Sequence, residues 1–317
     1  MPKLKLIGVD LGGTTFSVGL VSEDGKILKK VTRDTLVENG KEDVIRRIAE
    51  TILEVSDGEE APYVGIGSPG SIDRENGIVR FSPNFPDWHN VPLTDELAKR
   101  TGKKVFLEND ANAFVLGEKW FGAGRGHDHI VALTLGTGIG GGVVTHGYLL
   151  TGRDGIGAEL GHVVVEPNGP MCNCGTRGCL EAVASATAIR RFLREGYKKY
   201  HSSLVYKLAG SPEKADAKHL FDAARQGDRF ALMIRDRVVD ALARAVAGYI
   251  HIFNPEIVII GGGISRAGEI LFGPLREKVV DYIMPSFVGT YEVVASPLVE
   301  DAGILGAASI IKERIGG

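Results

Sequence analysis

Cysteine is scarce in this sequence. The chain of 317 residues has three cysteines, and all of them lie between Cys172 and Cys179. An odd and clustered set is a poor disulfide framework for a chain of this size, which excludes a disulfide-stapled secreted scaffold. The clustering favours a metal site over cross-links.

Long apolar runs and a strong charge of one sign are also missing. No stretch approaches the roughly 18 apolar residues that a membrane-spanning helix needs, and the apolar run at residues 6–9 is too short for a signal peptide. The formal net charge is only -3, so no strong field attracts nucleic acid or an anionic membrane. We expect a cytoplasmic protein with small-molecule partners, and neither nucleic acid nor a membrane among them.

Strand-like and helix-like segments alternate along the chain. Residues 42–55 have apolar side chains at helical spacing, and a strand-like run follows at 63–66. Residues 229–252 form a long periodic helix, and 257–260 a buried strand that ends in three glycines. The small-residue helix at 302–308 is suited to close packing and is expected to cross back to the first half. With 44% hydrophobic residues, the pattern predicts two lobes of α/β architecture.

Two segments, 4–29 and 129–152, share one design: an apolar strand, a Gly/Thr turn and a second apolar strand. The repetition suggests duplicated halves. Glycine-rich turns present backbone N–H groups without side chains in the way, so two facing turns could clamp a triphosphate. Asp10 ends the first strand, where its carboxylate could hold Mg²⁺ and Thr14 could add a hydroxyl contact; stabilising a tight turn is the alternative for Asp10.

Two other nucleotide-binding motifs do not fit this sequence. Residues 136–141 match G-x-G-x-x-G, but Val143 and Val144 continue an apolar strand where a dinucleotide-binding motif requires a helix. No G-x-x-x-x-G-K-[ST] segment occurs, which excludes a P-loop kinase. The phosphate site is therefore expected to be of the hairpin kind.

Asp110 lies where a predicted strand ends and the predicted helix 111–121 begins. Phosphoryl transfer to an alcohol needs a group that orients the hydroxyl and accepts its proton, and an aspartate at the mouth of a cleft can do so. A helix N-cap is the plain alternative, because Asp often caps helices. The residue alone does not decide between these two roles.

One histidine and the three cysteines fall within eighteen residues, from His162 to Cys179. A Cys₃His set is typical of structural zinc, and four protein ligands leave no open position for catalysis; three unrelated buried thiols are the alternative. Glu159 and Glu181 flank the cluster and could accept hydrogen bonds from sugar hydroxyls. Each would otherwise be an ordinary surface glutamate.

Taken together, these segments resemble the ROK family (repressors, open reading frames and kinases), and particularly its bacterial glucokinases. The resemblance covers nearly the whole length, and the joint occurrence of its motifs is highly specific. They are D-L-G-G-T at 10–14, N-D-A-N at 109–112, L-G-T-G-I-G-G-G at 135–142, E-L-G-H at 159–162 and C-x-C-G-x-x-G-C-x-E at 172–181.

The resemblance implies an α/β fold of two ribonuclease-H-like (actin-like ATPase) lobes around an interdomain cleft. It implies glucokinase activity with ATP and Mg²⁺, a structural Zn²⁺ and a homodimer. We assign residues 1–118 with 303–317 to the small lobe, and 119–302 to the large lobe with its zinc loop at 159–181.

The resemblance also implies a role for each matching residue. Asp110 becomes the base for the sugar 6-hydroxyl, and His162 serves both zinc and sugar through its two ring nitrogens. The sugar contacts are Ser68, Asn84, Asn109, Asp110, Glu159, His162 and Glu181, of which Ser68 and Asn84 match less strictly. The metal ligands are His162, Cys172, Cys174 and Cys179. The nucleotide contacts are Asp10, Gly12, Gly13, Thr14, Thr15, Gly136, Thr137, Gly138, Gly261, Gly262 and Gly263.

Three alternatives remain beside the glucokinase interpretation. A kinase of another hexose, such as N-acetylglucosamine, N-acetylmannosamine or fructose, would share every motif, and polyphosphate could replace ATP. A sugar-sensing transcriptional regulator is disfavoured, because the first strand is expected by Leu4 with no helix-turn-helix segment before it. A nucleotide switch or filament subunit would share the two hairpins but would not need Asp110 or the zinc loop.

Overall fold

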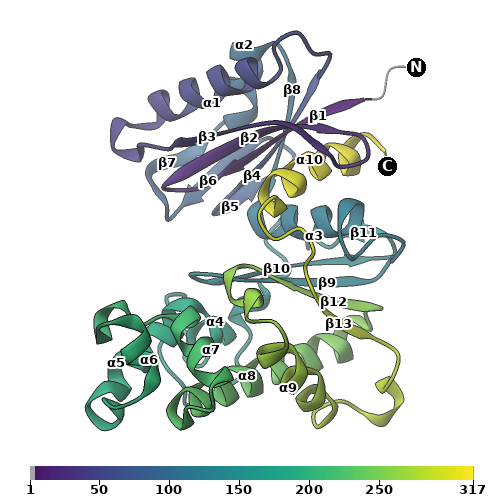
Figure 1. The fold of residues 1–317 in the computed structure, drawn as a ribbon. Coiled ribbons are helices and arrows are strands. Elements are labelled where there is room, and N and C mark those ends of the chain that lie inside the picture. Colours follow the sequence, from purple (N-terminus) through teal and green to yellow (C-terminus); the bar gives the residue numbers. More distant parts are fainter. Residues whose placement is uncertain (1–3, 317) are drawn as a thin grey trace.

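The structure is a computed structural model that describes residues 4–316 (Figure 1). Its first five-stranded sheet has the order β3-β2-β1-β4-β8. Strands β1 and β2 form an antiparallel hairpin, whereas β4 and β8 run parallel to β1. The strands are β1 (Lys5–Leu11), β2 (Thr15–Ser22), β3 (Ile27–Asp34), β4 (Tyr63–Ser68) and β8 (Lys104–Asn109), with helices α1 (Lys41–Val55) and α2 (Leu93–Thr101) in the same lobe.

The second five-stranded sheet repeats this arrangement in the order β11-β10-β9-β12-β13. Its hairpin is β9 with β10, and β12 runs parallel to β9. The predicted duplication of the two hairpins is therefore confirmed. The strands are β9 (Ile130–Leu135), β10 (Ile139–Thr145), β11 (Tyr148–Leu149), β12 (Ile257–Gly261) and β13 (Glu292–Ala295).

Helices cover the second sheet on the side away from the first lobe (Figure 1). The predicted long helix is α8 (Arg229–Phe253), whose cap at Asn254 has a left-handed conformation with φ of 44°. The other α-helices in this lobe are α4 (Leu180–Ala184), α5 (Ala186–Tyr200), α6 (Leu204–Ala209), α7 (Ala217–Arg225) and α9 (Glu269–Val280). It also has the short 3-10 helices η2 (Leu160–His162), η3 (Pro212–Lys214), η4 (Gly263–Ala267) and η5 (Pro285–Phe287). The first lobe has one short 3-10 helix among its described residues, η1 (Val37–Asn39). No helix within residues 4–316 is long and apolar enough to cross a membrane.

Two helices lie between the lobes (Figure 1). They are α3 (Asp110–Phe121) and the C-terminal α10 (Ala302–Ile315), which pack on each other. Helix α10 crosses back onto β1 and β4, as expected from its small residues. Glycines in those strands make this possible, since a Cβ on Gly8 would lie 2.2 Å from the carbonyl oxygen of Ile304, and one on Gly65 1.9 Å from that of Ala307.

A third, three-stranded sheet lies beside the cleft end of the first sheet. It consists of β5 (Ser71–Asp73), β6 (Ile78–Ser82) and β7 (Phe85–Val91), paired antiparallel. The predicted lobe boundaries after residue 118 and before residue 303 fall inside α3 and α10. Those boundaries stay a prediction, because both helices contact elements of more than one sheet.

Candidate active site

A cavity of about 560 Å³ opens between the two lobes. Its walls come from the ends of β4 and β8, the start of α3, the β9–β10 turn and the segment before η2. Ten of the predicted site residues line it: Asn84, Asn109, Asp110, Gly136, Thr137, Gly138, Glu159, His162, Glu181 and Gly262. The predicted sugar contacts among them lie up to 97 positions apart in the sequence, from Asn84 to Glu181, and the fold brings them together.

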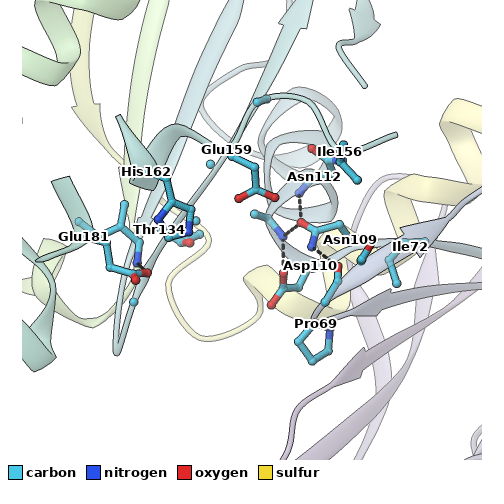
Figure 2. Close-up of a pocket in the computed structure, with 18 of the residues that line it drawn as sticks. Pro69, Ile72, Asn109, Asp110, Asn112, Thr134, Ile156, Glu159, His162 and Glu181 are labelled. Atoms are coloured by element: carbon cyan, nitrogen blue, oxygen red, sulfur yellow. Dashed lines mark hydrogen bonds between the residues drawn. The ribbon is translucent and has the colours of Figure 1, made fainter. Parts of the chain in front are cut away.

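The start of α3 holds Asn109 and Asp110 at the cavity (Figure 2). The N-cap of α3 is Asn109, whose Oδ1 accepts hydrogen bonds from the N–H groups of Ala111 (2.9 Å) and Asn112 (3.3 Å). Its Nδ2 donates to the carbonyl oxygen of Gly70 at 3.2 Å. Asp110 is therefore the first helical residue, and the N-cap alternative for Asp110 is wrong.

The environment of Asp110 suits a group that takes up a proton. The pKa of Asp110 is raised to about 6, mainly by burial among protein atoms and in smaller part by the negative charges of Asp10 and Glu159. The N–H of Ala111 donates to Oδ1 at 2.9 Å and lowers the pKa in part. The side chain still reaches solvent through the cavity, so a substrate hydroxyl can approach it.

Glu159 and His162 face the α3 side of the cavity from the opposite lobe (Figure 2). Both belong to the short turn that includes η2, where the N–H of His162 donates to the carbonyl oxygen of Glu159 at 3.0 Å. Gly161 lets this turn approach β10, because a Cβ there would lie 1.9 Å from the carbonyl oxygen of Ile139. The two side chains therefore sit on a closely packed support.

Glu181 connects the cysteine loop to the second glycine turn. Its Oε2 accepts a hydrogen bond from the N–H of Ile139 at 2.9 Å, and a Cβ on Gly138 would lie 2.4 Å from the same oxygen. The turn itself is closed by the N–H of Gly136 donating to the carbonyl oxygen of Gly138 at 2.9 Å. A side chain at position 138 would displace the carboxylate.

The predicted metal ligands converge. The ligand atoms of His162, Cys172, Cys174 and Cys179 all lie within 4.8 Å of one another. Sγ of Cys174 is 3.5 Å from Sγ of Cys179, and Nδ1 of His162 is 3.6 Å from Sγ of Cys172. These separations fit a tetrahedron of ligands about 2.0–2.3 Å from a central zinc ion.

The first glycine turn lies beside the cavity without lining it. A Cβ on Gly13 would come 3.0 Å from Cβ of Asn84, which does line the cavity. Burial raises the pKa of Asp10, and Gly303 at the start of α10 packs so closely that a Cβ there would be 2.1 Å from Oδ2 of Asp10. The predicted nucleotide residues outside this cavity are Asp10, Gly12, Gly13, Thr14, Thr15, Gly261 and Gly263.

Ser68 does not reach the cavity. Its side chain is fully buried at the end of β4, and its hydroxyl lies 3.4 Å from the carbonyl oxygen of Pro69. The neighbouring Pro69 and Gly70 form the wall instead. The geometry gives no support to a direct sugar contact by Ser68.

Several cavity residues were not predicted from the sequence. Ile72 of β5 and Ile156 from the loop before η2 add apolar surface to the wall (Figure 2). A second cavity, of about 330 Å³, lies between α7 and η4 and is lined by Lys218, Phe221, Asp222, Arg225, Gly263 and Arg266 among others. Gly262 lines the large cavity and Gly263 the small one, so neighbouring residues of the triglycine turn face the two cavities.

Comparisons with known proteins agree with this geometry. A sequence profile of the ROK family matches residues 6–314. The chain is 36% identical to a glucokinase of Halalkalibacterium halodurans over 97% of this chain and 95% of that protein. It is 30% identical to a xylose repressor of Caldicellulosiruptor bescii over 96% of this chain and 77% of that protein.

A solved structure has the same fold. It is a ROK family glucokinase from Streptomyces griseus in complex with glucose and AMPPNP, with a TM-score of 0.83 and 36% identity over 96% of this chain and 98% of that one. The predicted two-lobed α/β fold of the actin-like ATPase type is confirmed. With a profile match over nearly the whole described chain, the protein belongs to the ROK family.

Proposed function

We propose that this protein is a glucokinase, which transfers the γ-phosphoryl group of ATP to the 6-hydroxyl of glucose. The observation that carries the proposal is the single cavity that gathers Asp110, Asn109, Glu159, His162 and Glu181 beside the second glycine turn. A sugar has many hydroxyls, and carboxylate, amide and imidazole groups can pair with them. The names of the glucokinase relatives support glucose as the acceptor.

In the proposed reaction Asp110 orients the 6-hydroxyl and accepts its proton. The hydroxyl oxygen forms a bond to the γ-phosphorus while the bond to the bridging oxygen of ADP breaks, giving glucose 6-phosphate and ADP. Asn109, Glu159 and Glu181 hold the other hydroxyls, so that much of the rate comes from positioning. Mg²⁺, when bound, neutralises phosphate charge, and the carboxylate of Asp10 is suited to hold it.

Zinc is proposed as the occupant of the Cys₃His cluster. Three thiolates and one imidazole at tetrahedral separations are a typical structural zinc set. With Nδ1 of His162 turned to the cysteines, the other ring nitrogen is free to face a sugar hydroxyl. The metal would thereby fix the orientation of a sugar-binding side chain.

ATP is favoured over polyphosphate by the second cavity. A nucleoside needs a pocket beyond the phosphate site, and the cavity at α7 and η4 is lined by Gly263, the neighbour of Gly262 in the large cavity. Lys218, Asp222 and Arg225 offer polar and charged groups there for a ribose or a base. A polyphosphate chain would use no such pocket.

The test is steady-state ADP release with Mg²⁺-ATP across glucose, N-acetylglucosamine, mannose and fructose. We expect glucose to give the highest kcat/KM. A preference for another hexose would change the acceptor only, since selectivity depends on hydrogen-bond matching around the sugar ring. No stimulation by any sugar would overturn the kinase assignment and favour a regulator, in line with the repressor relative. The homodimer and the cytoplasmic location stay predictions.

A further inference from the structure

A buried carboxylate lies directly behind the proposed sugar-binding segment. Glu108, the residue before Asn109 in β8, is 1% exposed. Its Oε1 accepts two hydrogen bonds at 3.0 Å, one from the N–H of Asn109 and one from Nδ2 of Asn112. This one oxygen therefore fixes both the backbone of Asn109, the N-cap of α3, and the side chain of Asn112 in the first turn of the helix.

The other oxygen of Glu108 faces a cation from a different wall of the cavity. Nε of Arg74 is 3.2 Å from Oε2 of Glu108, and both side chains are largely shielded from solvent, with 16% and 2% of their surface exposed. Arg74 follows β5, whose Ser71 and Ile72 line the cavity. The ion pair therefore joins the β5 wall to the start of α3.

Arg74 is held in turn by the C-terminal helix. Arg314 of α10 donates to the carbonyl oxygen of Arg74 at 3.3 Å and pairs with Glu75 at 2.7 Å. Glu75 is mostly exposed, so the pair it forms is worth little by itself. Its role is to keep the β5–β6 turn, and with it Arg74, against Glu108.

The cost of burying Glu108 makes its cation necessary. A carboxylate withdrawn from water needs both a cation and hydrogen-bond donors, and removing only the cation leaves a charge without compensation. The structure supplies Arg74 as the cation, and Asn109 and Asn112 as donors. Losing Arg74 would thus displace the segment that carries Asn109 and Asp110.

We propose that Glu108 and Arg74 are positioning residues for sugar binding, which fix Asn109 and the start of α3 against the β5 wall. This inference rests on the proposed function. Neither side chain lines the cavity, so both act through the residues that they hold. Loss of the hydrogen bonds that Glu108 accepts, or of the cation that compensates its charge, should raise the KM for sugar and leave the KM for ATP nearly unchanged.

The decisive comparison uses two double variants without a buried charge. Both carry Arg74→Met; one adds Glu108→Gln, and the other Glu108→Leu. Only glutamine can still accept hydrogen bonds from Asn109 and Asn112. We expect the Gln double variant to keep the glucose KM within about threefold of wild type, and the Leu variant to raise it on the order of tenfold or more, because small displacements of positioned groups are costly.

Two single variants complete the test. Arg74→Met should raise the glucose KM at least as far as the Leu double variant, because Glu108 is then a buried charge without a cation. Arg80→Met is the matched control: Arg80 pairs with Asp73 at 3.0 Å in the same small sheet, but its side chain is 43% exposed, and we expect wild-type kinetics.

The outcomes separate this inference from the proposed function. Wild-type ADP release must first depend on glucose; if it does not, the proposed function fails. If the wild type is active and the Gln and Leu double variants have the same glucose KM, the positioning role is overturned. A rise in the KM for ATP as large as that for glucose would also contradict it, because that result would indicate general damage to the fold.

Discussion

At the scale of single residues, Asp110 carries the proposed chemistry. Replacing it with asparagine removes the proton acceptor but keeps the shape and most of the hydrogen bonding of the side chain. We expect Asp110→Asn to lower kcat by roughly 10²–10⁴, the range that a general base contributes, with sugar binding within a few-fold of wild type. Isothermal titration with glucose and steady-state turnover measure the two effects separately.

The matched control for Asp110 is Asp43→Asn. Asp43 lies on α1 and pairs with Arg46, away from the cavity. We expect this variant to turn over at the wild-type rate. An Asp110→Asn enzyme with unchanged kcat would eliminate the carboxylate as base.

The raised pKa of Asp110 predicts a pH dependence. A base must be deprotonated to act, and burial raises the pKa of Asp110 from 3.8 to about 6. The kcat/KM for glucose should therefore be level above pH 7 and decrease tenfold per pH unit well below pH 6. A profile that stays level down to pH 5 would show that ionisation of this carboxylate does not limit the reaction.

The same shift gives the sign of a stability effect. The folded protein binds the Asp110 proton more tightly than the unfolded chain, so ionisation above pH 6 costs stability, and this cost fades as the pH falls from 6 to about 4. Because the side chain reaches solvent through the cavity, water screens the charge. Asp110→Asn should then stabilise the protein at pH 7 by no more than about 1 kcal/mol.

At the scale of elements, the cysteine loop is the segment most dependent on a ligand. Residues 163–179 have two isolated bridges, Val164 with Cys179 and Met171 with Arg177, and no longer strand. Gly178 has φ of 75°, and a Cβ there would lie 1.6 Å from the carbonyl oxygen of Glu166. So irregular a loop needs an additional constraint, which zinc would supply.

We expect one zinc ion per chain by elemental analysis. Chelation, or Cys174→Ser, should lower Tm and raise the glucose KM on the order of tenfold, because His162 and Glu181 lose their support. Adding Zn²⁺ back should restore both in the chelated wild type, and Mg²⁺ should not. Protein that contains no zinc and shows the same Tm after chelation would contradict the proposal.

The helices and strands that were predicted from the sequence have buried residues at regular spacing. Strand β12 and helix α8 are examples, with continuous or helical burial and clear stops at Gly262 and Asn254. Strand β7 was not predicted. Its buried residues are Phe85, Trp88 and Val91, three positions apart, so the alternation that indicates a strand is absent.

The candidate site could be predicted where a motif places the chemistry on one short segment. Asn109 with Asp110, and His162 with the cysteines, are of this kind, and the structure brings each set together. Contacts between distant segments could not be predicted. The Arg74–Glu108 pair joins a turn to a strand 34 positions away. Taken alone, the sequence of either segment predicts only an ordinary charged residue at the surface.

At the scale of the whole molecule, the chain passes between the lobes twice, after α3 and before α10 (Figure 1). One side chain connects the two passages. Glu118 of α3 is fully buried; its Oε2 accepts a hydrogen bond from the N–H of Ala123 at 2.9 Å, and its Oε1 accepts one from the hydroxyl of Ser296. Both of these donors are neutral groups.

Glu118 is therefore expected to couple the two lobes. In Glu118→Ala the N–H of Ala123 and the hydroxyl of Ser296 lose a buried acceptor and a cavity forms, so the free energy of unfolding should fall by about 2–4 kcal/mol. The control is Ser309→Ala in α10, a buried serine whose hydroxyl donates within its own helix to the carbonyl oxygen of Leu305 at 2.7 Å. It should cost about 1 kcal/mol.

The pH dependence of the Glu118 contribution has a definite sign. Burial raises the pKa of Glu118, so its ionised form is penalised in the folded state, and that penalty fades as the pH falls from 7 toward 4.5. Glu118→Gln removes the penalty and can keep both contacts, with its carbonyl oxygen accepting from the N–H of Ala123 and its NH₂ donating to the hydroxyl of Ser296. Urea unfolding at several pH values should show wild type gaining stability relative to Glu118→Gln as the pH falls, and a difference independent of pH would mean that the pKa of Glu118 is the same in the folded and unfolded states.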